Sequence, residues 1–197
     1  MLEIIRSQVE SSIRVKQALL NDPELLKLIE KVSKLVINAY KNGNKTLLAG
    51  NGGSAADAQH IAAEFVSRFY FDRPGLPSIA LTTDTSMLTA IGNDYGFERL
   101  FARQLQAQGN EGDIFIGIST SGNSPNVIKA FEACKQKGIL SIGLTGMSGG
   151  KMAEICDICI RVPSNDTPRI QEVHILIGHI ICLIVEQELF PDYRPVL

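Results

Sequence analysis

Hydrophobic residues at the start of the chain recur every three or four positions, which predicts an amphipathic helix. The narrow apolar stripe of this helix consists of Leu2, Ile5, Val9 and Ile13. Asp22-Pro23-Glu24 has the composition of a helix start and predicts a second helix that runs to Gly43. The two helices are expected to form a hairpin outside any sheet. The apolar stripe has coiled-coil spacing, so a contact between subunits is about as well supported as packing of the helix against the core of its own chain.

After Gly43 the pattern changes to short apolar runs that alternate with helical patterns. The runs predict five buried parallel strands, at Thr46 to Gly50, Ser78 to Leu81, Ile114 to Ile118, Leu140 to Leu144 and Ile158 to Val162. Helices are expected between them, at about 54–70, 85–108, 125–137, 150–156 and 167–189. The pattern predicts an α/β fold, a three-layer doubly wound sandwich with a five-stranded parallel sheet, preceded by a helical hairpin at residues 1–43. Residues 1–197 are expected to form one domain.

Composition places the chain among ordinary globular proteins, with 197 residues of which 45% are hydrophobic and 20% charged. The net charge of −2 and the lack of a basic block give no support for nucleic-acid binding. The N-terminus lacks the apolar centre of a signal peptide, so a cytoplasmic location is expected. The longest apolar run, Ile175 to Val185, is interrupted by His179 and is shorter than the roughly 20 residues that span a bilayer. We therefore expect no membrane insertion.

Four cysteines, Cys134, Cys156, Cys159 and Cys182, fit a reducing compartment better than a disulfide framework in a chain of this size. Only Cys156-x-x-Cys159 has a suggestive spacing. No second pair accompanies it, and it leads into an apolar run, so buried packing is favoured over a redox or zinc role.

The stretch Ser119-Thr120-Ser121-Gly122-Asn123-Ser124 lies between an apolar strand and a helix that Pro125 opens. Its hydroxyls and the free N–H groups of a helix start form a cradle for an anion, and Gly122 allows a tight turn. A well-capped helix also has Ser124 and Pro125, but one cap does not require four hydroxyls in six residues. Phosphate binding is therefore favoured over capping alone.

The first strand ends in Gly50-Asn51-Gly52-Gly53-Ser54, and Ser54 with Asp57 resembles a capping box for the next helix. Gly50, Gly52 and Ala55 also match a dinucleotide fingerprint loosely. No acidic residue ends the second strand cleanly to bind a ribose, and there is no Gly-Lys-Ser/Thr motif. Two separate strand-to-helix loops suit one small sugar phosphate better than a dinucleotide.

His60 and Glu64 lie four positions apart on the predicted helix 54–70 and project from the same face. Because they follow a ligand loop, a shared metal or substrate competes with the simpler interpretation of an exposed polar face. The last helix offers Gln171, Glu172, His174 and His179. For His179, taken alone, a core histidine is the simpler interpretation. Two imidazoles and a carboxylate in a phosphate-binding chain nevertheless form an acid–base or metal set.

Five motifs occur in the order typical of one family. They are Asn51-Gly52-Gly53-Ser54-Ala55-Ala56-Asp57, His60-x-x-x-Glu64, Gly92-Asn93-Asp94, Ser119-Thr120-Ser121-Gly122-Asn123-Ser124 and Arg169-Ile170-Gln171-Glu172. With them the chain resembles the phosphoheptose isomerases, which are sugar isomerase (SIS) domain enzymes. The likeness covers nearly the whole chain.

This resemblance implies conversion of sedoheptulose 7-phosphate to D-glycero-D-manno-heptose 7-phosphate through an enediolate. That reaction is the first step toward activated heptose for bacterial surface polysaccharide, including lipopolysaccharide. The resemblance also implies a cytoplasmic homotetramer with one zinc ion per subunit. By motif match, the metal ligands are His60, Glu64, Gln171 and His179. The substrate-binding residues are Asn51, Gly52, Gly53, Glu64, Asn93, Asp94, Ser119, Thr120, Ser121, Ser124 and Gln171. Glu64 corresponds to the family's base and His179 to its acid.

Two alternatives stay open at this point. Non-catalytic SIS proteins that bind the bacterial replication initiator are similar to this chain, but they lack the carboxylate and the histidine at the positions of Glu64 and His179. The second alternative is another ketose–aldose phosphate isomerase that acts on a shorter sugar, because the loop residues do not define the number of carbons in the substrate. One tension concerns the metal ligands: Gln171 and His179 are separated by about 12 Å of helix rise.

Overall fold

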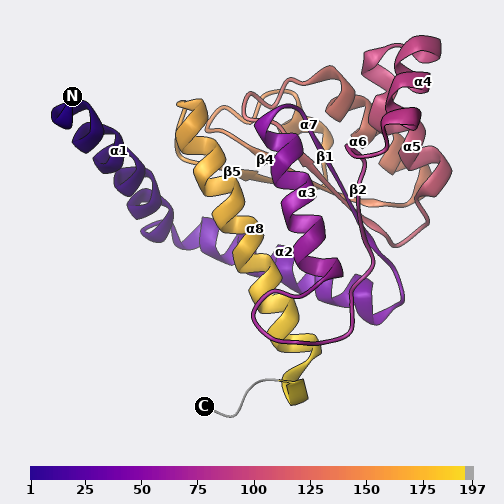
Figure 1. The fold of residues 1–197 in the computed structure, drawn as a ribbon, viewed down its shortest axis with the longest axis horizontal. Helices are drawn as coiled ribbons and strands as arrows, with labels where there is room; N and C mark the ends of the chain where they lie inside the picture. The colour runs from indigo at the N-terminus through magenta and orange to yellow at the C-terminus, as the bar shows by residue number, and fades with distance from the viewer. Residues whose placement is uncertain (194–197) are drawn as a thin grey trace.

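The computed structural model describes residues 1–193, and its centre is a parallel sheet of five strands (Figure 1). The strands are β1 (Thr46–Gly50), β2 (Ser78–Ala80), β3 (Ile114–Ile118), β4 (Leu140–Thr145) and β5 (Ile158–Arg161). They lie in the order β2-β1-β3-β4-β5, and each neighbouring pair is parallel. The doubly wound five-stranded fold predicted from the apolar runs is thus confirmed.

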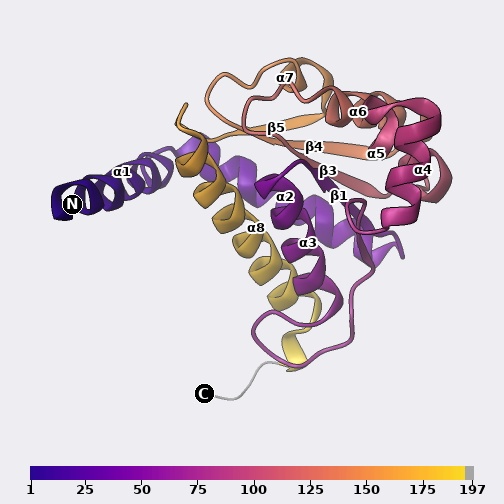
Figure 2. The same cartoon turned by 45° about the horizontal axis from the view of Figure 1, so that its top comes forward.

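Helices cover both faces of the sheet and complete three layers (Figure 2). One face carries α2 (Pro23–Lys41), α3 (Gly53–Val66) and α8 (Thr167–Leu189). The other carries α5 (Leu100–Gln108), α6 (Pro125–Lys137) and α7 (Met152–Ile155), with α4 (Thr85–Tyr95) at the end near β2. Strand β3 shows why: Ile116 packs into the core beneath α2, α3 and α8, whereas Phe115 packs against Phe131 of α6. A strand buried on both faces reads as a continuous apolar run.

The strand order brings two loops together. Gly50 at the end of β1 is paired with Ile118 at the end of β3. Because parallel strands end at the same edge of a sheet, the loops 51–53 and 119–124 leave side by side. Both loops lead directly into helices, α3 and α6.

Two predicted helices differ from those observed. The helix expected at 85–108 is divided at Gly96, whose φ of 85° ends α4, and a short 3₁₀ turn (η1, Phe97–Arg99) leads into α5. Helical periodicity continues through this break, so the pattern alone does not detect it. The helix expected at 54–70 ends at Val66. Beyond it, the N–H groups of Phe69 and Tyr70 donate to the Glu186 carboxylate of α8 instead of to helical carbonyls.

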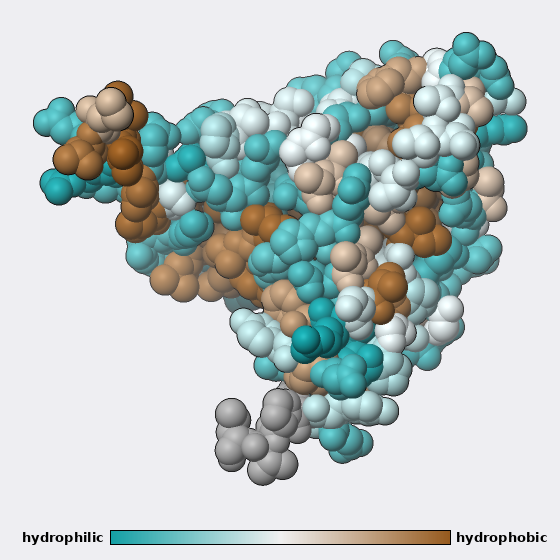
Figure 3. All heavy atoms as spheres, viewed as in Figure 1, coloured by the Kyte–Doolittle hydropathy of each residue, from teal (hydrophilic) through white to brown (hydrophobic). Residues whose placement is uncertain are grey.

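The two predicted N-terminal helices are present, but α1 (Leu2–Leu20) extends away from the sheet and does not fold back along α2 (Figures 1 and 2). Asp22 caps α2 and accepts hydrogen bonds from the N–H groups of Glu24 and Leu25. Of the α1 residues, Leu19 alone is buried. The four stripe residues are 55–82% exposed, and apolar atoms gather along α1 in Figure 3. This apolar surface has no partner within the described part of one chain.

Helix α8 is long and apolar enough to span a membrane by length and composition, the one helix among the described residues to meet that test. The argument that its apolar run is too short therefore does not hold for the whole helix. Its apolar character has a different explanation, because Val173, Ile177 and Ile181 are buried in the core with residues of α2 and α3.

Candidate active site

Three side chains from α3 and α8 meet in one group. His60 Nε2 lies 3.0 Å from Glu64 Oε1. His179 Nε2, from α8, lies 3.3 Å from His60 Nε2. The ligand atoms of all three lie within 4.8 Å of one another. The structure therefore brings together two imidazoles and a carboxylate that are up to 119 residues apart in the sequence.

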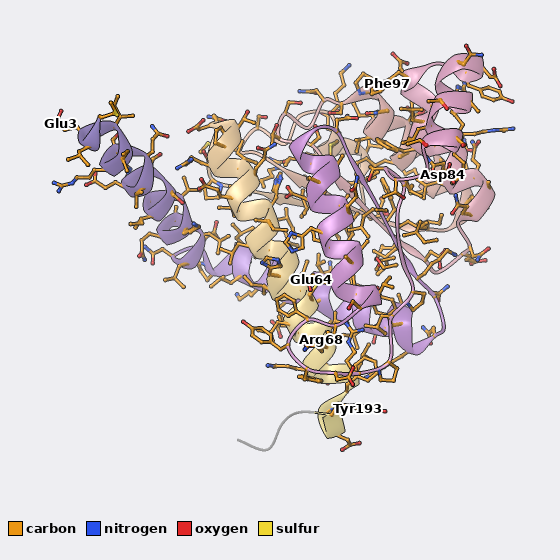
Figure 4. All side chains as sticks on the ribbon, in the orientation of Figure 1. Glu3, Glu64, Arg68, Asp84, Phe97 and Tyr193 are labelled. Atoms are coloured by element: carbon orange, nitrogen blue, oxygen red, sulfur yellow. The ribbon has the colours of Figure 1, made fainter. Side chains whose placement is uncertain are left out.

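Close packing of α3 against α8 produces this meeting. Gly178 approaches Ile61 so closely that a Cβ at Gly178 would lie 2.5 Å from Ile61 Cδ1. The neighbouring residues, His179 and His60, then face each other across the helix pair, with ring centroids 4.9 Å apart. In Figure 4 Glu64 lies on α3, on the side next to α8. The lack of a side chain at position 178 thus sets the separation of the two histidines.

Electrostatics at the group favour neutral imidazole at His179. Burial, and then the nearby His60, lower the pKa of His179, while Glu64 opposes the shift. Metal binding requires neutral imidazole and ionised carboxylate, and neutral His179 meets that requirement. Half of the His60 side chain is exposed (49%), so the group is open to solvent and ligand. These three residues are suited to hold a divalent metal ion or to exchange protons with a substrate.

Gln171 lies in the first turns of α8, next to the start of α3. A Cβ on Gly53 would lie 2.6 Å from Gln171 Nε2, so the amide rests on the first turn of α3. It is two helical turns, about 12 Å of rise, from His179. In this conformation Gln171 faces the loop after β1 instead of the histidines.

The hydroxyls of the loop 119–124 converge. Ser119 Oγ lies 2.8 Å from Ser124 Oγ and 3.5 Å from Ser121 Oγ. Ser124 is the N-cap residue of α6, yet its side chain makes no cap hydrogen bond. Its hydroxyl points back into the loop instead, so capping does not account for it. Gly122 has a φ of 66°, and a Cβ there would lie 2.0 Å from the Gly149 carbonyl oxygen.

An amide pair ties this loop to the one after β1. Asn51 Nδ2 donates to Asn126 Oδ1 at 2.9 Å, and Asn126 Nδ2 donates back to Asn51 Oδ1 at 2.8 Å. Asn126 also accepts the N–H of Val127 at 3.0 Å, which holds it in the first turn of α6. Gly52, with a φ of 55°, is the N-cap of α3, and Ser54 makes no capping box. Asn126 was not predicted from the sequence, although an asparagine two residues after Ser124 in a ligand loop was a usable signal.

The remaining predicted substrate residues are Thr120, whose backbone alone makes a hydrogen bond within the described chain, and the pair Asn93 and Asp94, which is separate from the two loops. Thr120 is half-buried, and its carbonyl accepts the N–H of Gly146 at 3.0 Å. Asn93 and Asp94 are exposed at the end of α4, where Asn93 Nδ2 donates to Asp94 Oδ1 at 2.9 Å. Within residues 1–193, no recorded hydrogen bond joins this pair to the loops of β1 or β3.

A buried ion pair holds the segment that follows α3 next to the group of His60, Glu64 and His179. Glu186 is fully buried and binds Arg73 Nε at 3.1 Å, besides the N–H groups of Phe69 and Tyr70 at 2.7 Å each. Arg73 Nη2 donates to the carbonyl of Glu64 at 2.8 Å. The Phe69 ring lies 5.4 Å from the His179 ring, measured between centroids. The segment after α3 is thus anchored both to Glu64 and beside His179. No sequence spacing pointed to this pair.

Two further titratable groups lie on the same helices. Burial raises the pKa of Asp57 to about 6, against the effect of His60, and Asp57 Oδ2 is buried without a hydrogen-bond partner among residues 1–193. His174 is fully buried, its Nε2 lies 3.1 Å from the carbonyl oxygen of Thr145, and burial lowers its pKa to about 4. His174 therefore stays neutral and serves packing against β4.

Comparison with known proteins places these features in a family. The SIS domain family model matches residues 14–146. Phosphoheptose isomerase of Aneurinibacillus thermoaerophilus is 72% identical over 190 residues, which cover 96% of each chain. Phosphoheptose isomerase 2 of Campylobacter jejuni is 73% identical over 186 residues, 94% of this chain and 92% of the relative.

Solved structures agree with this assignment. The phosphoheptose isomerase of Neisseria gonorrhoeae superposes with a TM-score of 0.89 at 44% identity, and that of Francisella tularensis with 0.90 at 42%. Each match covers 94% of this chain and 98% of the other. Unlike the SIS model, which ends before α8, these matches span almost the full length. The chain belongs to the phosphoheptose isomerase family of SIS domain proteins.

Proposed function

We propose that this protein is a ketose–aldose isomerase that converts sedoheptulose 7-phosphate to D-glycero-D-manno-heptose 7-phosphate. The observation that carries the proposal is the meeting of His60, Glu64 and His179 in a chain 72% identical to a phosphoheptose isomerase. The product would enter the synthesis of activated heptose for surface polysaccharide such as lipopolysaccharide.

The reaction moves a carbonyl from C2 to C1. A base removes a proton from C1, an enediolate forms, and a proton returns to C2 while the oxygens exchange theirs. We assign the base to Glu64 and the acid to His179. Burial and the nearby His60 lower the pKa of His179, so its neutral imidazole takes up a proton from the substrate before it acts as the acid. Each such group typically supplies a factor of about 10² to 10⁴.

We propose zinc as the metal, one ion per subunit, held by His60, Glu64 and His179. Two imidazole nitrogens on a tetrahedral zinc, each at about 2.0–2.1 Å, lie about 3.3 Å apart. His60 Nε2 and His179 Nε2 have a separation of 3.3 Å, which supports this assignment. A bound zinc ion would polarise the ketone as a Lewis acid.

Gln171 is proposed as the fourth ligand and as a substrate contact. To reach an ion at His179 it must leave Gly53 and turn along α8, or come from a neighbouring subunit. These routes are distinguished by mixed tetramers in which Gln171→Ala subunits are combined with subunits that lack His179. The bound metal is then measured. Rescue of metal binding in the mixed tetramer supports the neighbouring subunit.

The substrate phosphate is assigned to the loop of β3, through Ser119, Thr120, Ser121 and Ser124. Three of these hydroxyls converge at the first turn of α6, where the helix dipole attracts an anion. The remaining substrate contacts are assigned to the β1 loop and to α4, at Asn51, Gly52, Gly53, Asn93 and Asp94. Binding of the remote phosphate would hold C1 and C2 beside Glu64.

We also propose a cytoplasmic homotetramer of one-domain subunits, which binds neither nucleic acid nor membrane. The exposed stripe of α1 supports an oligomeric state, since its apolar surface is unpartnered in one chain. The double substitution Ile5→Ser and Val9→Ser should separate the subunits and so reduce the sedimentation coefficient. An unchanged coefficient would show that the apolar stripe of α1 does not form the subunit contact.

Turnover of sedoheptulose 7-phosphate by the purified protein tests the function. Glu64→Gln and His179→Gln should each lose a factor of about 10² or more in kcat, with folding retained. Glu132→Gln, at an exposed residue of α6, is the matched control and should retain full activity. Metal analysis of all three variants, with and without chelation, tests the zinc assignment. A wild-type protein that is inactive in every metal condition refutes the isomerase.

A further inference from the structure

Two of the four thiols occupy one face of the sheet beside the phosphate loop. Cys159 is paired with Gly143 across β4 and β5, so their side-chain positions share a face. Cys156, at the end of α7, covers the same glycine: a Cβ on Gly143 would lie 3.1 Å from Cys156 Sγ. Cys156 Sγ and the Cys159 side chain therefore lie on the same face of the sheet, next to Gly143, and a side chain at position 143 would meet Cys156 Sγ.

Their surroundings differ from those of the other cysteines. Cys134 and Cys182 are fully buried, whereas Cys156 and Cys159 are only partly buried. Thr145 Oγ1 lies 3.8 Å from Cys159 Sγ. The thiol of Cys156, then Thr145 and Arg161, lower the pKa of Cys159, against burial, which would raise it. The pKa of Cys156 is raised, by its hydrogen bond to Cys159 and by burial.

The pair is linked to the phosphate loop through one helical turn. Cys156 N–H donates to the Met152 carbonyl at 3.0 Å, and Met152 N–H donates to the Gly122 carbonyl at 3.0 Å. Lys151 N–H donates to Asn123 Oδ1 at 3.1 Å. Because α7 has only four residues, these hydrogen bonds connect Cys156 to Gly122 and Asn123 through a single helical turn.

We propose that Cys156 and Cys159 form a peroxide-sensitive dithiol, which closes reversibly to a disulfide and shifts α7 against the phosphate loop. The sequence favoured buried packing for these thiols, and the proposal adds a redox role to that expectation. The disulfide itself stands independently of the enzyme's activity. Its effect on substrate binding rests on the proposed function, through the role given to the loop 119–124.

The oxidant is hydrogen peroxide, and the chemistry balances in two steps. The Cys159 thiolate attacks one peroxide oxygen, the O–O bond breaks, and hydroxide leaves with the electron pair. The sulfur becomes a sulfenic acid, oxidised by two electrons. Cys156 sulfur then attacks that sulfur, the S–O bond breaks, and water leaves with the Cys156 proton. In total two thiols and one peroxide give one disulfide and two water molecules.

Peptide mass spectrometry tests the dithiol directly. Trypsin cuts after Lys151 and Arg161, so both cysteines fall in one peptide, residues 152–161. Brief peroxide treatment of the full-length protein at pH 7 should remove two hydrogens from this peptide, and a thiol reductant should restore them. Cys134 and Cys182 serve as internal controls and should react at least about tenfold more slowly.

Two variants identify the roles. Cys156→Ser should trap Cys159 as a sulfenic acid that dimedone labels, whereas Cys159→Ser should leave Cys156 reduced. Equal labelling in both, or a peptide 152–161 that oxidises no faster than Cys134, would overturn the proposal.

Kinetics test the link to the phosphate loop. Oxidation should raise KM for the sugar phosphate about tenfold, reversibly, in the wild type and not in Cys156→Ser. A disulfide without a change in KM would refute the link alone. A protein without any turnover would refute the isomerase, and the peptide mass would still decide on the dithiol.

Discussion

Replacement of Glu186 by glutamine tests the buried ion pair beneath the active site. The substitution preserves the shape of the side chain and removes its charge. Glu186 Oε1 accepts from Phe69 N–H and Arg73 Nε, and Oε2 accepts from Tyr70 N–H, all at 2.7–3.1 Å. Glutamine has one oxygen and an NH₂ group, so one backbone N–H faces a second donor, and the Arg73 guanidinium loses its counter-charge.

The magnitude follows from burial. The side chains of Arg73 and Glu186 are 1% and 0% exposed, so water does not replace the lost contacts. Breaking a buried pair by removal of one partner costs about 3–5 kcal/mol. A chain of this size loses about 2–4 °C in Tm for each kcal/mol. Glu186→Gln should therefore lower Tm by about 6–20 °C.

Thermal unfolding followed by circular dichroism measures the change in Tm, urea unfolding measures the change in free energy, and Glu188→Gln is the matched control. Glu188 is exposed two residues further along the same helix, where a substitution should change stability by no more than about 0.5 kcal/mol. If Glu186→Gln lies within about 1 kcal/mol of the wild type, the pair is not a stabilising anchor, and the reasoning is refuted. Because Arg73 also holds the Glu64 carbonyl, turnover should fall further than the folded fraction does.

Three more substitutions test other contacts. Gly122→Ala forces a Cβ onto a residue with φ of 66° and against a backbone oxygen, so KM for the sugar phosphate should rise about tenfold; unchanged kinetics would contradict a phosphate role for this loop. Gly178→Ala should push α8 away from Ile61, cost about 1–3 kcal/mol and weaken metal binding, and Ile61→Val should partly restore both in calorimetry and metal titration. Burial would raise the pKa of Asp113, but hydrogen bonds from Lys45 and the backbone lower it overall. A depressed pKa stabilises the fold above the unfolded value of about 3.9, and this stabilisation is lost as pH falls below it, so the deficit of Asp113→Asn in urea unfolding should be larger at pH 7 than at pH 3.

Local pattern was enough to predict most of the elements and the type of site. The five short apolar runs after Gly43 became strands. Ile114 to Ile118 shows the reason, because a strand buried on both faces consists of apolar residues throughout. The cap at Asp22 and the cluster of hydroxyls after β3 are also local, since their partners lie within a few residues. The match to known motifs added the expected ligands and the reaction.

The tertiary structure decided what depends on partners far along the chain. His60 and His179 meet because Gly178 lets two helices approach, and periodicity cannot reveal how close two helices pack. Glu186 ends α3 early by accepting N–H groups more than a hundred residues away. The break at Gly96 is a third case, since glycine is compatible with a continuous helix and the fold selects its positive φ. For the histidines and for Glu186, the local residues allowed more than one arrangement, and contacts between segments far apart in the sequence chose between them.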